Sequence, residues 1–353
     1  MNDIIRLAFV GIDNPHGAGW RDLLLNFTDQ ARIVELCPGY DGTTYSLEER
    51  YADLPIRGDV DELLKEGEFD AAVVCLPNDQ GPAAIKRLAS HGKHVLCEKP
   101  IAASGSDAAG MCKAIKKSGV AFQSGYTWRY DDLATRLRRM IDEERFGKLI
   151  HIDMSMITSD VRRRGPDHYL FDAEQSQVGF FNWLGCHYLD LLFYLTSCKV
   201  VGVTARTGVF GAVDADVEDG GSILIDLDDG CLVTFTGGYW IPRWAGENRV
   251  TIRGSQRWAH WDPARKGTDG ALEIHGPQPQ WYAMEDDYEL SPDDTPGYGG
   301  VRGVRLVQDW LDVIRGESKR CRNTPASTLA TLKLLDAAYK SSSKGQRVAC
   351  SIS

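Results

Sequence analysis

The stretch KHVLCEKP, from Lys93 to Pro100, contains an apolar, β-prone run that stops at a carboxylate, an amine and a proline. Similar runs recur through the first 125 residues, and segments with helical spacing of apolar residues separate them. This alternation predicts a doubly wound parallel sheet with helices on both faces, in an α/β fold. The strands are expected at residues 4–11, 31–37, 71–77, 93–97 and 120–125.

The ends of these strands predict where a ligand binds. Carboxyl ends of parallel strands lie at one edge of a sheet, and open α/β sheets bind ligands beyond that edge. Gly11, Pro77, Gly125 and the pair Glu98–Lys99 all fall at such ends. Lys99 is therefore expected beside the ligand crevice rather than as an ordinary surface charge.

The pattern changes after about residue 130 to longer strands, several with alternating polarity. DLDDGCLV, residues 226–233, places Asp229-Gly230 between two strand runs, which is the strongest short hairpin signal. This half predicts an α+β domain with a large, mostly antiparallel sheet. Helices are expected at about 182–195, 304–315 and 325–341, and residues 262–300 as a long surface excursion. The length of 353 residues predicts two domains, 1–127 and 128–353.

Composition excludes several classes of protein. Forty basic and fifty acidic residues give a net charge of −10, which does not attract nucleic acid. No apolar run is long enough to span a membrane, and no signal peptide opens the chain. Nine cysteines without a C-x-x-C pair indicate reduced thiols. We therefore expect a cytoplasmic protein without nucleic-acid or membrane partners.

The first glycine loop is GIDNPHG, residues 11–17, between a strand and an amphipathic helix. That context fits a dinucleotide fingerprint, although Asp13 and His16 occupy the second and third glycine positions. A pyrophosphate could rest on the helix N-terminus, and an ordinary βα turn is the alternative. Asp41 is the candidate for the adenosine ribose, and no arginine nearby would clamp a 2′-phosphate, which favours NAD over NADP. The loop candidates are Gly11, Ile12, Asp13, Asn14 and His16.

The stretch GCHYLD, residues 185–190, places His187 and Asp190 on the same side of an expected helix. A packing histidine is the alternative interpretation. One histidine and one aspartate are fewer protein ligands than a typical metal site has, so no metal is expected. A nucleophile triad lacks support because no G-x-S-x-G elbow occurs.

The segments GKHVLCEKPIAAS (residues 92–104), GCHYLD and 309–348 together resemble the Gfo/Idh/MocA oxidoreductases, such as glucose–fructose oxidoreductase and inositol dehydrogenase. The resemblance covers nearly the whole chain. It implies a Rossmann domain followed by a domain whose sheet packs against a partner subunit, and therefore a homodimer or homotetramer. It also implies bound NAD, with NADP as the alternative, and a sugar or cyclitol substrate.

The resemblance also implies roles for particular residues. The family's E-K-P lysine contacts the substrate hydroxyl and nicotinamide ribose, and its G-x-H-x-x-D histidine serves as acid/base; here these are Lys99 and His187. Many members have an aspartate four residues before that histidine, where this chain has Trp183. The remaining cofactor candidates are Pro77, Asn78, Glu98, Trp128 and Arg129, and the substrate candidates are Tyr126, His168, Tyr169, Asn182 and Asp190.

Oxidation of a secondary alcohol sends a hydride to nicotinamide and a proton to a base that titrates near neutrality. Histidine starts there, whereas lysine has an ordinary pKa of about 10.4. We expect His187 to accept the proton and Lys99 to polarise the alkoxide, and the reverse assignment stays open. The expected function is an NAD(P)-dependent dehydrogenase acting on CH–OH groups of sugars, cyclitols or glycosides. Two alternatives are a glycoside-cleaving enzyme that oxidises its substrate transiently with tightly bound NAD, and a cofactor-less sugar sensor.

Overall fold

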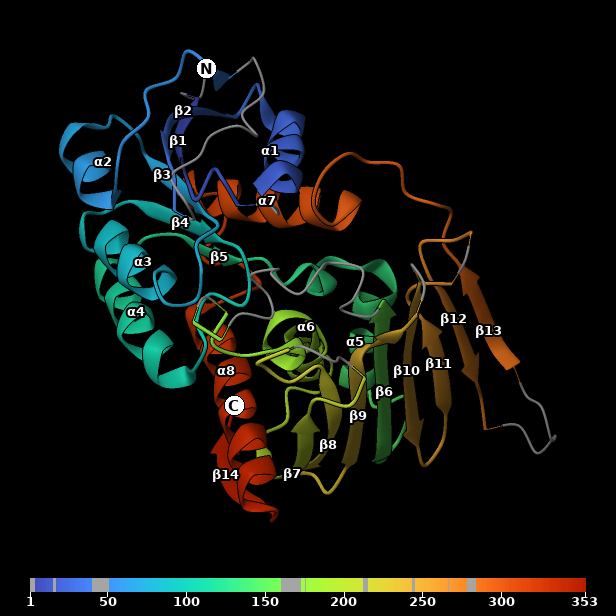
Figure 1. The fold of residues 1–353 in the computed structure, drawn as a ribbon. Helices are drawn as coiled ribbons and strands as arrows, with labels where there is room; N and C mark the ends of the chain where they lie inside the picture. The colour runs from blue at the N-terminus through green and yellow to red at the C-terminus, as the bar shows by residue number, and fades with distance from the viewer. Residues whose placement is uncertain are drawn as a thin grey trace. The chain divides into compact units, whose positions relative to one another are not determined.

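The chain divides into two compact units, residues 1–130 with 294–329, and residues 131–293 with 330–353. The expected division after residue 127 differs from this, because residues 294–329 pack with the first unit. Figure 1 shows both units coloured along the chain. The computed structural model describes residues 4–14, 17–39, 51–159, 173–174, 176–211, 215–242, 245–265, 267–277 and 284–353.

The first unit contains the predicted parallel sheet. Its strand order is β2-β1-β3-β4-β5, so the direction of winding reverses at β1. Every neighbouring pair is parallel, which confirms the doubly wound arrangement. The strands are β1 (Ile5–Val10), β2 (Ala31–Cys37), β3 (Ala71–Val74), β4 (His94–Cys97) and β5 (Phe122–Ser124).

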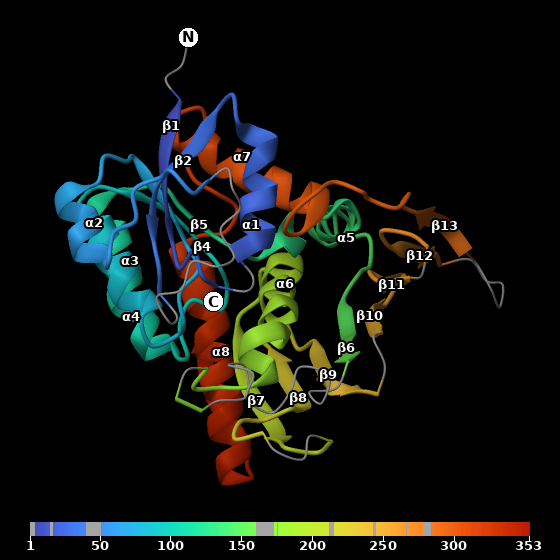
Figure 2. The same cartoon turned by 45° about the horizontal axis from the view of Figure 1, so that its top comes forward.

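Helices cover both faces of this sheet, as Figures 1 and 2 show. One face carries α2, α3 and α4, and the other carries α1 together with α7, which comes from the returning segment. Trp20 of α1 and Trp310 of α7 are fully buried in the same apolar core. The helices are α1 (Gly17–Leu24), α2 (Val60–Glu66), α3 (Gly81–Ser90), α4 (Gly105–Ser118) and α7 (Gly300–Ile314), and a 3₁₀ turn follows β5 (Thr127–Tyr130).

The second unit contains a nine-stranded sheet, called the large sheet below, in the order β13-β12-β11-β10-β6-β9-β8-β7-β14. Among the strands that the structure describes in this sheet, only β6 and β9 pair in parallel, so the prediction of a mostly antiparallel sheet is confirmed. The Asp229-Gly230 hairpin joins β8 to β9 as expected. The strands are β6 (Leu149–Ser159), β7 (Val200–Gly208), β8 (Gly220–Leu227), β9 (Leu232–Ile241), β10 (Gly246–Gly254), β11 (Trp258–Asp262), β12 (Ala271–His275), β13 (Met284–Glu289) and β14 (Val348–Ile352).

Residues 262–300 are not the single surface excursion that their composition suggested. They contain β12 and β13 of the large sheet, and their last residues belong to the first unit, where Tyr298 stacks on Trp20. The glycines and prolines that suggested a loop lie largely between and beyond these strands.

Helices of the second unit pack on one face of the large sheet. Tyr188 of α6 stacks on Phe235 of β9 with ring centroids 5.6 Å apart, and Ser341 of α8 accepts a hydrogen bond of 3.0 Å from Ala205 N. The helices are α5 (Asp132–Asp142), a π-helical turn (Phe181–Gly185), α6 (Cys186–Thr196) and, from residue 330 on, α8 (Pro325–Lys344). None of the helices in the described residues combines the length and apolarity needed to cross a bilayer.

Candidate active site

The loop after β1 is built around Gly11. Its φ of +82° lies in the left-handed region, and a Cβ there would lie 2.3 Å from the carbonyl oxygen of Cys75. The amide of Gly11 donates a hydrogen bond of 2.7 Å to Cys37 O at the end of β2. The loop therefore passes close to both neighbouring strand ends, which only glycine permits at this position.

The other loop candidates have structural partners. The Asp13 carboxylate accepts a hydrogen bond of 2.8 Å from Gly39 N, which ties this loop to the one after β2. The Asn14 side chain is buried and donates a hydrogen bond of 2.8 Å to Cys75 O, beyond β3. Ile12 is fully buried, and its carbonyl accepts a hydrogen bond of 2.9 Å from Arg21. His16 lies outside the described residues.

A cavity of about 410 Å³ lies beside the ends of β1, β2 and β3. The residues that line it include Asp59, Asp61 and Arg87, and no sequence motif indicated a binding role for any of the three. Asp61 and Arg87 form an ion pair, whereas the Asp59 carboxylate caps α2 by accepting from Asp61 N and Glu62 N. The capping role was readable from the sequence, because an aspartate directly precedes a short amphipathic segment.

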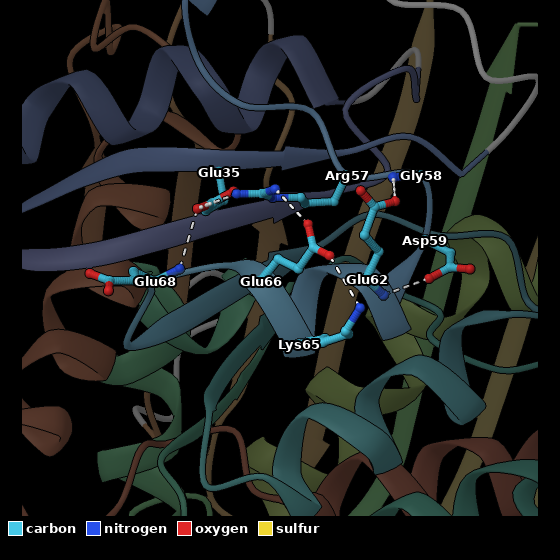
Figure 3. A network of polar contacts seen from close by, with 8 residues as sticks. All are labelled: Glu35, Arg57, Gly58, Asp59, Glu62, Lys65, Glu66 and Glu68. Carbon is cyan, nitrogen blue, oxygen red and sulfur yellow. Dashed lines mark hydrogen bonds and ion pairs between the residues drawn. The ribbon is translucent and has the colours of Figure 1, made fainter.

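A polar network lies along β2 and α2 (Figure 3). The Arg57 guanidinium donates to the Glu35 carboxylate at 2.9 Å and pairs with Glu66 at 3.3 Å. Glu35 also accepts a hydrogen bond of 3.2 Å from Glu68 N. These contacts give Glu35 a structural role, because they tie β2 to the residues on either side of α2. Asp41, the candidate for the ribose contact, lies outside the described residues.

The remaining candidates of the first unit follow β3 and β5 at the same edge. Asn78 is 2% exposed, and the Pro77 carbonyl before it accepts the amides that open α3. Tyr126 is 1% exposed directly after β5. Trp128 lies under the Arg302 guanidinium, 4.4 Å from the ring centroid, and Arg129 donates to Arg322 O at 3.4 Å. Trp128 and Arg129 therefore contact the returning segment 294–329.

Glu98 and Lys99 follow β4, between the ends of β3 and β5. Both residues are buried, with exposed fractions of 8% and 4%, and the Lys99 amine lies 3.7 Å from Glu98 Oε1. Burial raises the pKa of the Glu98 carboxyl, while Lys99 and a hydrogen bond from Trp20 act in the opposite direction. The structure therefore gathers Gly11, Asn78, Glu98 and Lys99 at one edge of the sheet.

The second unit holds the predicted histidine at the start of α6. His187 is 7% exposed, and Asn182 and Asp190 are completely buried on the same continuous helical segment. Trp183 is 6% exposed in the π-helical turn before His187. His168 and Tyr169 lie outside the described residues.

The helical segment that carries His187 is anchored by a glutamate that no sequence motif indicated. The Glu218 carboxylate accepts hydrogen bonds from Gly179 N at 2.8 Å and Phe181 N at 3.2 Å. The Tyr339 hydroxyl donates to the same carboxylate at 2.7 Å. Burial raises the pKa of Glu218, and these three donors partly offset that effect. No sequence signal pointed to it, because Glu218 lies far along the chain from the turn that it caps.

A doubly wound parallel sheet with a glycine loop after β1 is typical of dinucleotide-binding proteins. Comparison with family models supports this class. The model described as "Oxidoreductase family, NAD-binding Rossmann fold" matches residues 5–126, and the "GFO/IDH/MocA C-terminal domain" matches residues 134–260. The chain belongs to the Gfo/Idh/MocA family of NAD-dependent oxidoreductases, as its motifs predicted.

Relatives match over nearly the whole length. Inositol 2-dehydrogenase of Rhizobium meliloti (strain 1021) is 25% identical over 331 residues, which are 90% of this chain and 91% of that protein. D-apiose dehydrogenase of Rhizobium rhizogenes is 24% identical over 98% of this chain and 96% of that one. The solved structure of the WlbA dehydrogenase from Bordetella pertussis, with NADH and UDP-GlcNAcA, has a TM-score of 0.81 at 21% identity, covering 99% and 100% of the chains.

The described residues fit a bound NAD. The loop at Gly11 has no side chain where it crosses the strand ends, and α1 begins directly after it. The cavity beside the end of β2 is lined by Pro38, Gly39 and Leu76, and burial raises the pKa of the Cys37 thiol there to about 12, which keeps it uncharged. The altered glycine loop, which suggested a cofactor-less sensor, keeps the geometry that requires glycine at position 11.

Proposed function

We propose that the protein transfers a hydride between the nicotinamide of NAD and a secondary hydroxyl of a sugar, cyclitol or glycoside. The observation that carries this proposal is the buried Lys99 amine beside Glu98 at the strand-end edge of an NAD-binding sheet. Full-length similarity to inositol and apiose dehydrogenases supports the substrate class.

Bound NAD supplies the hydride acceptor. The chain's own contribution begins with Lys99, whose amine is buried and faces a carboxylate, so a cation there is held in a low-dielectric site. A preorganised cation stabilises the negative charge that develops on the substrate oxygen more strongly than water would.

His187 is the proposed proton acceptor. The imidazole would take the hydroxyl proton of the carbinol when bound NAD accepts the hydride, so a carbonyl would remain. Histidine suits this role because its ordinary pKa is close to neutrality. Glu218 fixes the start of the helical segment that carries His187, which limits the positions that the imidazole can take. The proposal requires Lys99 and His187 to act on the same carbinol.

A substrate panel tests the proposal. The purified protein is incubated with NAD or NADP and with aldoses, inositols and aryl glycosides, and formation of reduced nicotinamide is followed by absorbance. We expect reduction of NAD with at least one polyol or sugar. Release of aryl alcohol without accumulation of NADH would instead favour glycoside cleavage by transient oxidation. Absence of nucleotide binding in a fluorescence titration would contradict both.

We further propose that the protein is a cytoplasmic homodimer or homotetramer that associates through the large sheet. Leu224 of β8 and Leu232 of β9 are 38% and 40% exposed on the outer face of the large sheet. Their neighbours along these strands, Ile223, Ile225 and Val233, point to the opposite face and are buried. Apolar side chains in that position on a sheet are favourable in an interface.

A further inference from the structure

A tryptophan contacts the carboxylate that partners Lys99. Trp20 of α1 is fully buried, and its indole N–H donates a hydrogen bond of 2.8 Å to Glu98 Oε2. The other carboxylate oxygen, Oε1, lies 3.7 Å from the Lys99 amine. One carboxylate therefore links the indole on one side to the lysine on the other.

Tyr298 holds the indole in place from the returning segment. The two rings are stacked, with centroids 4.7 Å apart and an angle of 24° between their planes. Tyr298 N donates a hydrogen bond of 2.8 Å to Gly19 O in α1. A Cβ at Gly297 would lie 2.3 Å from Leu23 N, so this approach requires glycine. The stack is thus fixed by backbone contacts at α1.

Gly125 closes the remaining space around the carboxylate. A Cβ at this residue would lie 2.9 Å from Glu98 Oε2 and 3.2 Å from Trp20 Cζ2. The Tyr298 hydroxyl donates to Gly125 O at 3.5 Å, so the same tyrosine also contacts this strand end. Glu98 is enclosed by Trp20, Gly125 and Lys99, which leaves its carboxylate little freedom to turn.

The electrostatics of this enclosure depend on few groups. Burial raises the pKa of Glu98, and Lys99 and the Trp20 hydrogen bond lower it. The thiols of Cys75, after β3, and Cys97, in β4, also lie close enough to Glu98 to interact with its charge. Burial raises the pKa of each thiol well above its ordinary value, so both are neutral. Arg21, next to Trp20, donates its guanidinium N–H to Ile12 O. The indole N–H of Trp20 and the backbone N–H of Lys99 are thus the neutral donors that favour the charged carboxylate, and the indole is the one that a side-chain substitution can remove.

We infer that Trp20, held by Tyr298, is a positioning residue that keeps Glu98 ionised and aimed at the Lys99 amine. The inference rests on the role proposed for Lys99 in catalysis, but the contact itself can be tested without turnover. Because a hydrogen bond to a charged group contributes about 1.5 kcal/mol or more, its loss should shift the titration of Glu98 upward by about one pH unit.

The first experiment uses the full-length protein with ¹⁵N-labelled tryptophan. Nine indole N–H signals are expected, and the Trp20→Phe variant assigns the signal of Trp20. At pH 8 we expect that signal to lie downfield of its position in Glu98→Gln, because a charged carboxylate accepts the indole hydrogen bond more strongly than a neutral amide does. The same position of the Trp20 signal in the wild type and in Glu98→Gln would overturn the inference, whatever the enzyme's substrate proves to be.

The second experiment compares Trp20→Phe with Trp310→Phe. Trp310 is a matched control because it is fully buried in the same core and its indole N–H has no hydrogen-bond partner among the described residues. With a substrate from the panel, we expect Trp20→Phe to lower kcat/KM relative to Trp310→Phe increasingly toward acidic pH, by up to about tenfold, in addition to the limb that protonation of His187 sets.

The two experiments separate the possible failures. Equal profiles for the two variants, or a loss of activity that follows thermal stability alone, would show that Trp20 is only a packing residue. A substrate panel without any turnover would contradict the proposed function, while a Trp20 signal that differs between the wild type and Glu98→Gln would still establish the link to Glu98.

Discussion

The hydroxyl of Tyr339 donates a hydrogen bond of 2.7 Å to the carboxylate of Glu218, which caps the turn leading to His187. This pair joins α8 to the start of the helical segment that carries the proposed acid/base. Because Glu218 is buried, removal of the Tyr339 donor leaves part of its carboxylate unsatisfied. Tyr339→Phe should lower the free energy of unfolding by about 1–3 kcal/mol in urea denaturation.

The raised pKa of Glu218 predicts a pH dependence of stability. Its folded-state pKa lies above the ordinary value of 4.5, so the stabilising contribution is complete below 4.5 and is lost as the pH rises through the folded value. Relative to Glu218→Gln, the wild type should lose unfolding free energy across that window. Glu285→Gln is the control with the opposite sign, because Arg257 lowers the pKa of Glu285 and its contribution is lost as the pH falls.

Lys99→Ala should abolish turnover while leaving NAD binding largely intact. The substitution removes the cation proposed to stabilise the developing alkoxide, which should reduce kcat by at least about 100-fold. Intrinsic tryptophan fluorescence measures NAD affinity, and absorbance measures turnover. Lys113→Ala on the exposed face of α4 is the control and should behave like the wild type. Lost NAD binding with preserved turnover would contradict the assignment.

Gly11→Ala should unfold or severely destabilise the first unit. A Cβ would lie 2.3 Å from a backbone oxygen at a φ of +82°, and the combined cost should exceed about 2 kcal/mol. Gly110→Ala is the matched control, because its Cβ would meet nothing within 4 Å on an exposed helix. That variant should gain about 0.5–1 kcal/mol of stability. Thermal unfolding of both proteins, with and without NAD, measures the difference.

Asp61 should contribute to a preference for NAD over NADP. It lines the cavity at the end of β2, where a carboxylate would repel an additional phosphate, and its ion pair with Arg87 neutralises the basic group beside it. Asp61→Asn should lower the ratio of the NAD affinity to the NADP affinity by about threefold. The factor is modest because the side chain is 53% exposed, so solvent screens its charge. Asp53→Asn, away from the cavity, should leave the ratio unchanged in the same fluorescence titration.

Leu224→Arg should reduce self-association. The residue is 38% exposed on the outward face of β8, so the substitution places a charge in the proposed interface without disturbing the core. Light scattering after size exclusion should show a smaller species than the wild type. Lys199→Glu, outside the strands, is the control. An unchanged mass for Leu224→Arg would argue against association through this face.

The sequence predicted the sheet of the first unit well, because each strand is a short apolar run and the helices between the strands have apolar residues at regular helical spacing. The Glu98–Lys99 pair was predicted to lie at the ligand edge for the same reason. Trp20 was not linked to Glu98, because 78 positions separate them and local pattern carries no signal for such a contact. Tyr298 was missed because its flanking glycines suggested a surface loop, whereas their small size is what allows the close packing against α1.

The return of residues 294–329 to the first unit has a consequence for biosynthesis. While the ribosome makes the second unit, the nascent chain of residues 1–130 already holds all five strands of its sheet but lacks α7. Trp20 and Leu23 then have no partner in Leu306 or Trp310, and an uncovered apolar face of that kind favours aggregation. Translation of residues 294–329 is therefore the step that lets the nucleotide-binding half reach its folded state, so a product that stalls or is truncated before them should depend on chaperones.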